Sequence, residues 1–125
     1  MKKYLNLAVV VISLATLFSG LAQVFLPAMV LNLIGAEVTP LSAHLFGIVG
    51  MFMALFGGLM LHVVYSAKAG QEAIWWCALQ KLGAFVAVSL GVLNGLFSVL
   101  ALGVALFDLF SGILFLYYIK VLRSQ

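Results

Sequence analysis

The chain has 125 residues, of which 66% are hydrophobic and only 7% are charged. A soluble domain carries about 25% charged residues, so this composition excludes a water-soluble globule and indicates a protein whose solvent is lipid. Six Lys and Arg residues give a formal net charge of +3 but form no basic patch, so nucleic acid is not an expected partner. Cys77 is the only cysteine, which excludes a disulfide within the chain.

Four apolar segments follow one another along the chain, and each has about the 20 residues that a membrane crossing requires. They predict one all-α domain over residues 1–125, an integral membrane antiparallel four-helix bundle. The predicted helices lie at about 4–26, 43–65, 74–94 and 99–120. The first segment also fits a signal peptide loosely, but its apolar stretch continues to Leu26, which favours a spanning helix.

Two connections between these helices carry their own signals. The first connection, residues 27–42, is longer than a turn requires, and we expect it to contain a short interfacial helix ended by Gly35. Between the third and fourth helices, Asn94–Gly95 is the stronger turn signal, and Ser98–Gly103 is the alternative.

The basic residues predict how the four spans are oriented. With four spans, both termini and the second connection share one side of the membrane. All six basic residues map to that side: Lys2, Lys3, Lys68, Lys81, Lys120 and Arg123. The positive-inside rule makes this side cytoplasmic, and every Tyr and Trp in the chain maps to the same interface. We therefore predict a multi-pass protein with cytoplasmic N- and C-termini.

Small residues recur at helical spacing in the later helices, and we expect them to mark where helix backbones meet. Lipid tails are as apolar as Leu, so close packing and internal hydrogen bonds must hold such helices together. The expected packing positions are Gly47, Gly50, Ala54 and Gly58 in the second helix, Ala87 and Gly91 in the third, and Ala105 and Gly112 in the fourth. Asp108 lies in line with the last two, so it is expected to face protein.

Asp108 is the only charged residue between Leu82 and Ile119. A rise of about 1.5 Å per residue puts it about 18 Å from the cytoplasmic boundary, where an unpaired carboxylate costs about 3 kcal/mol or more. Thr16 and Ser89 lie at similar depth. Lys81, about 10 Å deep, either extends back to the headgroups or pairs with Asp108. We take Asp108, Lys81, Thr16 and Ser89 as the candidate intramembrane polar site, with either a structural or an ion-binding role.

No pattern in the sequence points to catalysis or to a bound cofactor. His44 and His62 are the only histidines. Haem ligation by paired histidines would need a facing pair from another helix, and hence a dimer. There is no metal-ligand cluster, nucleophile–base arrangement, phosphate loop or carboxylate pair. We therefore expect a non-enzymatic protein with no catalytic, cofactor-binding or metal-binding residues.

Several stretches resemble a group of small bacterial four-helix membrane proteins of unknown function, loosely DoxX-like. These stretches are LAQVFLPAMVLNLIG at the end of the first helix, HLFGIVGMFMALFGGL in the second, QKLG in the third and FDLFSG in the fourth. The resemblance covers nearly the whole chain. It implies an antiparallel four-helix bundle in a bacterial inner membrane, and it implies no particular activity.

Three functions are compatible with these features. The first is a self-associating bundle or an accessory subunit of a membrane complex. The second is a small proton- or cation-coupled transporter centred on Asp108. The third is a redox subunit that binds a lipophile or quinone. Convergence of polar atoms from other helices on Asp108, around a water-sized cavity, would distinguish the second from the first.

Overall fold

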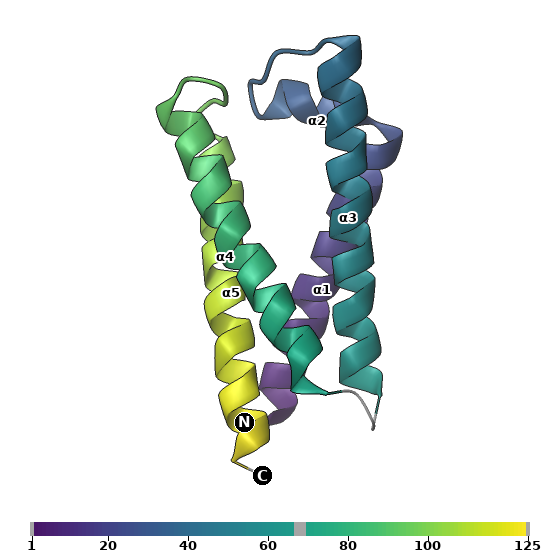
Figure 1. Cartoon of the computed structure of the whole chain (residues 1–125), viewed down its shortest axis with the longest axis vertical. Helices are drawn as coiled ribbons and strands as arrows, with labels where there is room; N and C mark the ends of the chain where they lie inside the picture. The colour runs from purple at the N-terminus through teal and green to yellow at the C-terminus, as the bar shows by residue number, and fades with distance from the viewer. Residues whose placement is uncertain (1, 67–69, 125) are drawn as a thin grey trace.

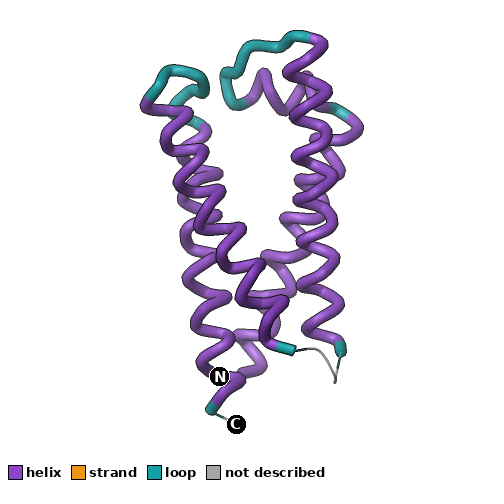
Figure 2. Tube along the Cα trace, viewed as in Figure 1, coloured by secondary structure: helices purple, strands orange, loops and turns teal. Residues whose placement is uncertain are grey.

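The computed structural model describes residues 2–66 and 70–124, and this part of the chain is helical and contains no strand (Figures 1 and 2). The helices are α1 (Lys2–Phe25), α2 (Pro27–Leu33), α3 (Pro40–Tyr65), α4 (Gln71–Leu93) and α5 (Ala101–Arg123). All but α2 are long and apolar enough to cross a membrane. The predicted fold class, an all-α bundle of four helices of membrane-spanning length, is confirmed. Lys68, which was assigned to the cytoplasmic side, lies outside the described residues.

The connection between α1 and α3 contains the short helix α2. Pro27 lies in the first turn of α2. An N–H at this position has no acceptor within the helix, so proline, which lacks the N–H, costs no hydrogen bond there. Gly35 follows the helix with a φ of 71°, a left-handed conformation that glycine adopts without steric penalty. Thr39 then caps α3, because its hydroxyl accepts from Ser42 N at 2.9 Å while Ser42 Oγ accepts from Thr39 N at 2.8 Å. The expected short helix is thus present.

The turn between α4 and α5 lies at the same end of the molecule as α2 (Figure 1). Helix α4 ends at Leu93, and Gly95 has a φ of 75°. The turn signal at Asn94–Gly95 is therefore the one that ends the helix. Ser98 in this turn donates its N–H to Ile34 O, which follows α2, at 2.8 Å. This hydrogen bond joins the two connections across the end of the molecule.

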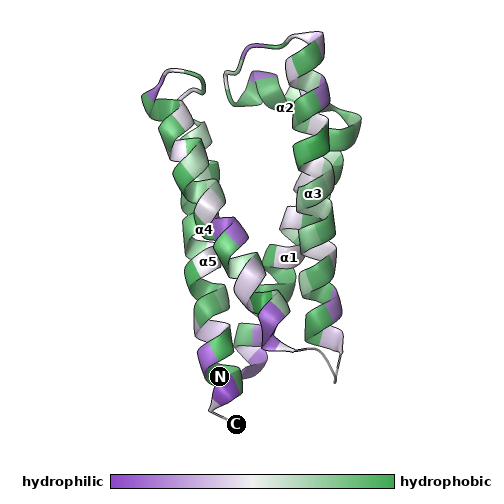
Figure 3. Cartoon of the chain, in the orientation of Figure 1, coloured by the Kyte–Doolittle hydropathy of each residue, from purple (hydrophilic) through white to green (hydrophobic). Residues whose placement is uncertain are grey.

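The four long helices associate as two antiparallel pairs. Helix α1 packs along α3 and α4 packs along α5, whereas α3 meets α4 and α1 meets α5 over much shorter stretches. The two pairs approach each other near the end that carries both termini and diverge towards the end with α2 (Figure 1). Hydrophobic residues cover most of the long helices, and a hydrophilic patch on α4 lies between the pairs (Figure 3).

Glycines allow the backbones of α1 and α3 to touch. A Cβ atom at Gly57 would lie 2.8 Å from both Leu17 N and Ser13 O. One at Gly50 would lie 2.6 Å from Gly20 O. Backbone atoms cannot move aside as a flexible side chain can, so these positions of α3 require glycine.

Other expected packing positions also lie in the interior. Gly47 faces α1, since a Cβ atom at this position would lie 3.7 Å from Gln23 O of α1. Ala54 also faces α1, since its backbone N would lie 2.6 Å from a Cβ atom added at Gly20 of α1. Ala105 and Gly112 are buried on α5, and a Cβ at Gly112 would lie 3.3 Å from Ala78 O of α4.

Three expected packing positions do not lie between helices. A Cβ at Gly58 would meet no described atom within 4 Å, and Ala87 is exposed. Each lies on the outer side of its helix, and Gly57, one residue before Gly58, takes the contact instead. Gly91 is buried, but the ring of Phe97 from the following turn covers it, with Cδ2 2.5 Å from where a Cβ would lie. Small-residue spacing thus identified interior positions on α5 and all but Gly58 on α3, whereas neither expected position of α4 lies between helices.

Candidate functional site

Polar side chains from three helices meet in the interior of the molecule. Lys81 Nζ of α4 lies 3.4 Å from Asp108 Oδ1 of α5 and donates a hydrogen bond of 2.6 Å to Thr16 Oγ1 of α1. The exposed fractions of Lys81, Asp108 and Thr16 are 3%, 8% and 2%. Because α1 belongs to one helix pair and α4 and α5 to the other, this cluster also connects the two pairs.

The structure decides between the two positions predicted for Lys81. Its side chain lies buried against Asp108. A buried charge requires a partner of opposite sign, and Asp108 supplies that partner. Of the two positions predicted for Lys81, the structure therefore has the pair with Asp108 and not the side chain extended back to the headgroups.

Three groups surround the Lys81 ammonium. Thr16 donates its hydroxyl proton to Ile12 O at 2.9 Å, so its oxygen is free to accept from Lys81. The centroid of the Phe107 ring lies 5.1 Å from Nζ, within the range of a cation–π interaction. A carboxylate, a hydroxyl and an aromatic ring thus replace the water that the ammonium loses on burial.

Asp108 is less completely paired than Lys81. The hydrogen bond from Lys81 reaches Oδ1 at 3.4 Å, and no described residue donates to Oδ2. A carboxylate can accept about four hydrogen bonds through its two oxygens. The Asp108 side chain is not fully buried, with an exposed fraction of 11%. The second oxygen of Asp108 therefore marks a position suited to a donor from outside the chain.

A cavity of about 460 Å³ lies between the two helix pairs beside this cluster. Its lining consists of the three clustered residues and a mostly apolar remainder: Ala15, Thr16, Ser19, Ala22, Gln23, Val30, Met53, Lys81, Gly103, Val104, Phe107 and Asp108. Several lining residues, including Ala15, Ser19 and Val104, are exposed, so the cavity opens at the side of the helices. Its volume lies within the range of small-molecule sites, about 300–1,000 Å³.

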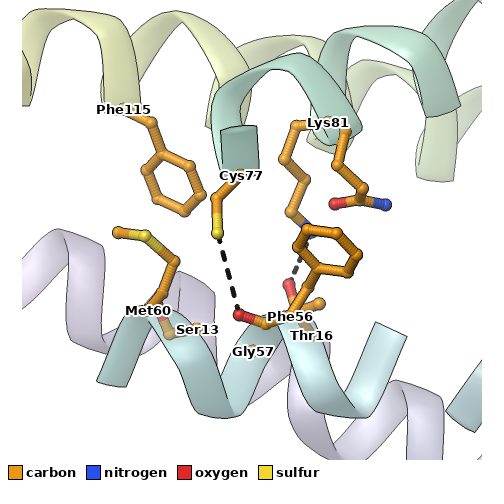
Figure 4. A pocket seen from close by; sticks show the side chains of 9 residues that line it. Ser13, Thr16, Phe56, Gly57, Met60, Cys77, Lys81 and Phe115 are labelled. Carbon is orange, nitrogen blue, oxygen red and sulfur yellow. Dashed lines mark hydrogen bonds between the residues drawn. The ribbon is translucent and has the colours of Figure 1, made fainter. Parts of the chain in front are cut away.

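A second hollow next to Lys81 is far smaller, about 10 Å³ (Figure 4). It has at most the room for one water molecule. Cys77 lies against it, and its thiol donates to Phe56 O at 4.0 Å (Figure 4). Met60 and Phe115 fill the neighbouring space (Figure 4). This hollow is a packing feature around a buried thiol.

Other residues singled out in the sequence lie away from the cluster. Ser89 is half-buried on α4 and is not among the residues that line the cavity. His44 and His62 occupy exposed positions of α3. Within residues 2–66 and 70–124, no group of three or more His, Cys, Asp and Glu side chains is placed to hold a metal ion.

Two residues of the site were not identified from the sequence. Phe107 is one of many apolar residues in its segment, and nothing in the sequence distinguishes it from the others. Gln23 lies in the first predicted helix and was not among the candidate residues, yet it is buried in the cavity wall. Gln23 could have been selected because it is a polar residue in an apolar helix. Its position in the sequence does not show, however, which way the side chain faces.

Comparisons of this chain with protein-family models, curated proteins and solved structures found no match. The resemblance to DoxX-like proteins therefore stays a prediction. The function is argued below from the geometry of the site.

Proposed function

We propose that this protein is a non-enzymatic integral membrane protein that binds a small membrane-soluble molecule between its two helix pairs. The supporting observation is Asp108 Oδ2, an acceptor without a partner among the described residues, at the polar end of a largely apolar cavity. Apolar walls with a few convergent polar groups are typical of small-molecule sites. It shares lipophile binding with the third function considered from the sequence, a redox subunit, but includes no redox role. Self-association, a role as accessory subunit and ion-coupled transport stay predictions.

The surroundings of Asp108 indicate the chemical class of the bound molecule. Lys81 and Asp108 carry opposite charges, so the site as a whole favours neither an anion nor a cation. The ammonium already contacts Thr16, Asp108 and Phe107, whereas Asp108 Oδ2 needs a donor. A hydroxyl is a neutral donor that is compatible with lipid. An acyl chain of a bulk phospholipid carries no such donor, so we expect a lipophilic alcohol to be preferred.

Binding of tritiated 1-decanol to the protein in lipid nanodiscs tests this proposal. We expect saturable binding above that of empty nanodiscs. 1-Methoxydecane, which lacks the donor, should compete about 10-fold or more less well than unlabelled 1-decanol, because a hydrogen bond to a charged group contributes about 1.5–3 kcal/mol. The double variant Lys81→Met/Asp108→Leu should lose saturable binding. Equal competition by the alcohol and the ether would contradict the proposal.

We also propose that the protein lies in a bacterial inner membrane with both termini in the cytoplasm. The two termini lie at the same end of the molecule (Figure 1). Lys2 and Lys3 begin α1, and Lys120 and Arg123 lie in the last turn of α5, so four basic residues gather at that end. The bacterial inner membrane is implied by the DoxX-like resemblance, and the cytoplasmic side by the positive-inside rule.

A topology experiment checks this orientation. A reporter fused after the last residue should be active in the form that requires the cytoplasm. A cysteine at position 37, in place of Glu37, should react with a membrane-impermeant maleimide added outside the cells. Cys77 is buried and serves as the unreactive internal control. A reporter active only outside the cytoplasm would contradict the proposed orientation.

A further inference from the structure

Gln23 is a second polar group in the wall of the 460 Å³ cavity. Its exposed fraction is 6%, and its amide nitrogen, Nε2, has no hydrogen-bond partner among the described residues. Buried polar atoms are almost always hydrogen-bonded in native proteins. Gln23, which lines the cavity, therefore carries a buried donor without a partner among the described residues, and Asp108 carries an acceptor without one.

Packing between α1 and α3 holds the base of the Gln23 side chain in place. A Cβ atom at Gly50 would lie 2.5 Å from Gln23 Cβ, and one at Gly47 would lie 3.7 Å from Gln23 O. The backbone and Cβ of Gln23 are therefore held against α3. The terminal amide lies beyond these contacts, in a residue that lines the cavity.

The distance between the two polar positions follows from the geometry of α1. Gln23 comes about two helical turns after Thr16, so both face the same side of the helix, and they are about 10 Å apart along its axis. Thr16 accepts a hydrogen bond from Lys81, which pairs with Asp108. Thr16 therefore marks the level of Asp108 along α1. Apolar side chains, including Met53 and Val104, line the space around these two positions.

We infer that Gln23 determines specificity by donating a hydrogen bond to an acceptor at the far end of the bound molecule. The molecule is then an elongated lipophile with a hydroxyl at Asp108 and a carbonyl or ether oxygen about 10 Å away along the cavity. This inference rests on the binding function proposed above. A lipophile with a hydroxyl alone would leave Gln23 Nε2 without a partner.

Two probes of matched chain length test the inference in nanodiscs. Methyl 10-hydroxydecanoate carries a hydroxyl at one end and an ester at the other, whereas 1-decanol carries the hydroxyl alone. The wild-type protein should bind the hydroxy ester roughly 5- to 10-fold more tightly, as expected for one added neutral hydrogen bond. Gln23→Met, which keeps the unbranched shape next to Gly50, should remove this advantage, so that the ratio of the affinities for the hydroxy ester and for 1-decanol falls to about one.

Gln80→Met is the matched control. Gln80 on α4 also has a buried amide atom without a partner, but it does not line the 460 Å³ cavity. This variant should keep the preference for the hydroxy ester. If Gln23→Met does not fold, methyl 6-hydroxyhexanoate and 1-hexanol give an independent test on the wild-type protein, because the shorter ester should not reach Gln23 and should show no advantage.

The possible outcomes separate this inference from the proposed function. If wild-type protein binds both ten-carbon probes equally, or if Gln23→Met keeps the preference, the inference is overturned while the binding of 1-decanol supports the proposed function. An ester advantage that is equal at six and ten carbons would also overturn it. If neither probe shows saturable binding, both the inference and the proposed function are overturned.

Discussion

Replacing Lys81 by Met is expected to lower the free energy of unfolding by about 3 kcal/mol or more. The substitution keeps much of the side-chain length but leaves the carboxylate of Asp108 in the interior without a cation. It also removes the hydrogen bond of 2.6 Å to Thr16 Oγ1, which connects α4 to the other helix pair. Reversible unfolding in mixed micelles, followed by the fluorescence of Trp75 and Trp76, would measure the loss.

The double variant Lys81→Met/Asp108→Leu is expected to recover most of this stability. When both charges are replaced by apolar groups, no buried ion remains uncompensated, and such replacements are often neutral or stabilising. Lys120→Met, which removes an exposed lysine from the last turn of α5, is the control for the loss of one positive charge and should have little effect. If the double variant is as unstable as Lys81→Met alone, the ion pair is not the source of the loss.

Gly57→Ala is expected to separate α1 from α3 and to destabilise the protein by about 1–3 kcal/mol, the usual range for overpacking. The added methyl group would lie 2.8 Å from Leu17 N and Ser13 O. Both are backbone atoms of a helix, so the strain is relieved only if the helices move apart. The same unfolding measurement would detect this effect.

Gly58→Ala provides a closely matched comparison, because it makes the same chemical change one residue along the same helix. The methyl group at this position would meet no described atom within 4 Å. Alanine is favoured over glycine inside a helix by about 0.5–1 kcal/mol, so this variant should be unchanged or slightly more stable. Equal losses at Gly57 and Gly58 would show that the assigned face of α3 is wrong.

The sequence by itself determined the all-α fold, the four long helices and the short helix between the first two. These features are local, because a helix in lipid satisfies its backbone hydrogen bonds within its own segment and needs a certain length of apolar residues to cross the membrane. The turn at Asn94–Gly95 is local as well, since it depends on glycine at a positive φ. Asp108, Thr16 and Lys81 could be selected as candidates because each is a polar residue in an apolar stretch.

Only the tertiary structure decided which of these polar residues meet and what lies beside them. A step of one residue turns a side chain by about 100° around a helix, so the spacing of small residues did not separate Gly57 from Gly58. Lipid tails and apolar side chains are alike, so hydropathy carries little information on which face of a helix meets another. The pairing of Lys81 with Asp108, the burial of Gln23 and the cavity between them depend on how the two helix pairs converge and diverge, and that arrangement results from contacts between segments far apart in the chain.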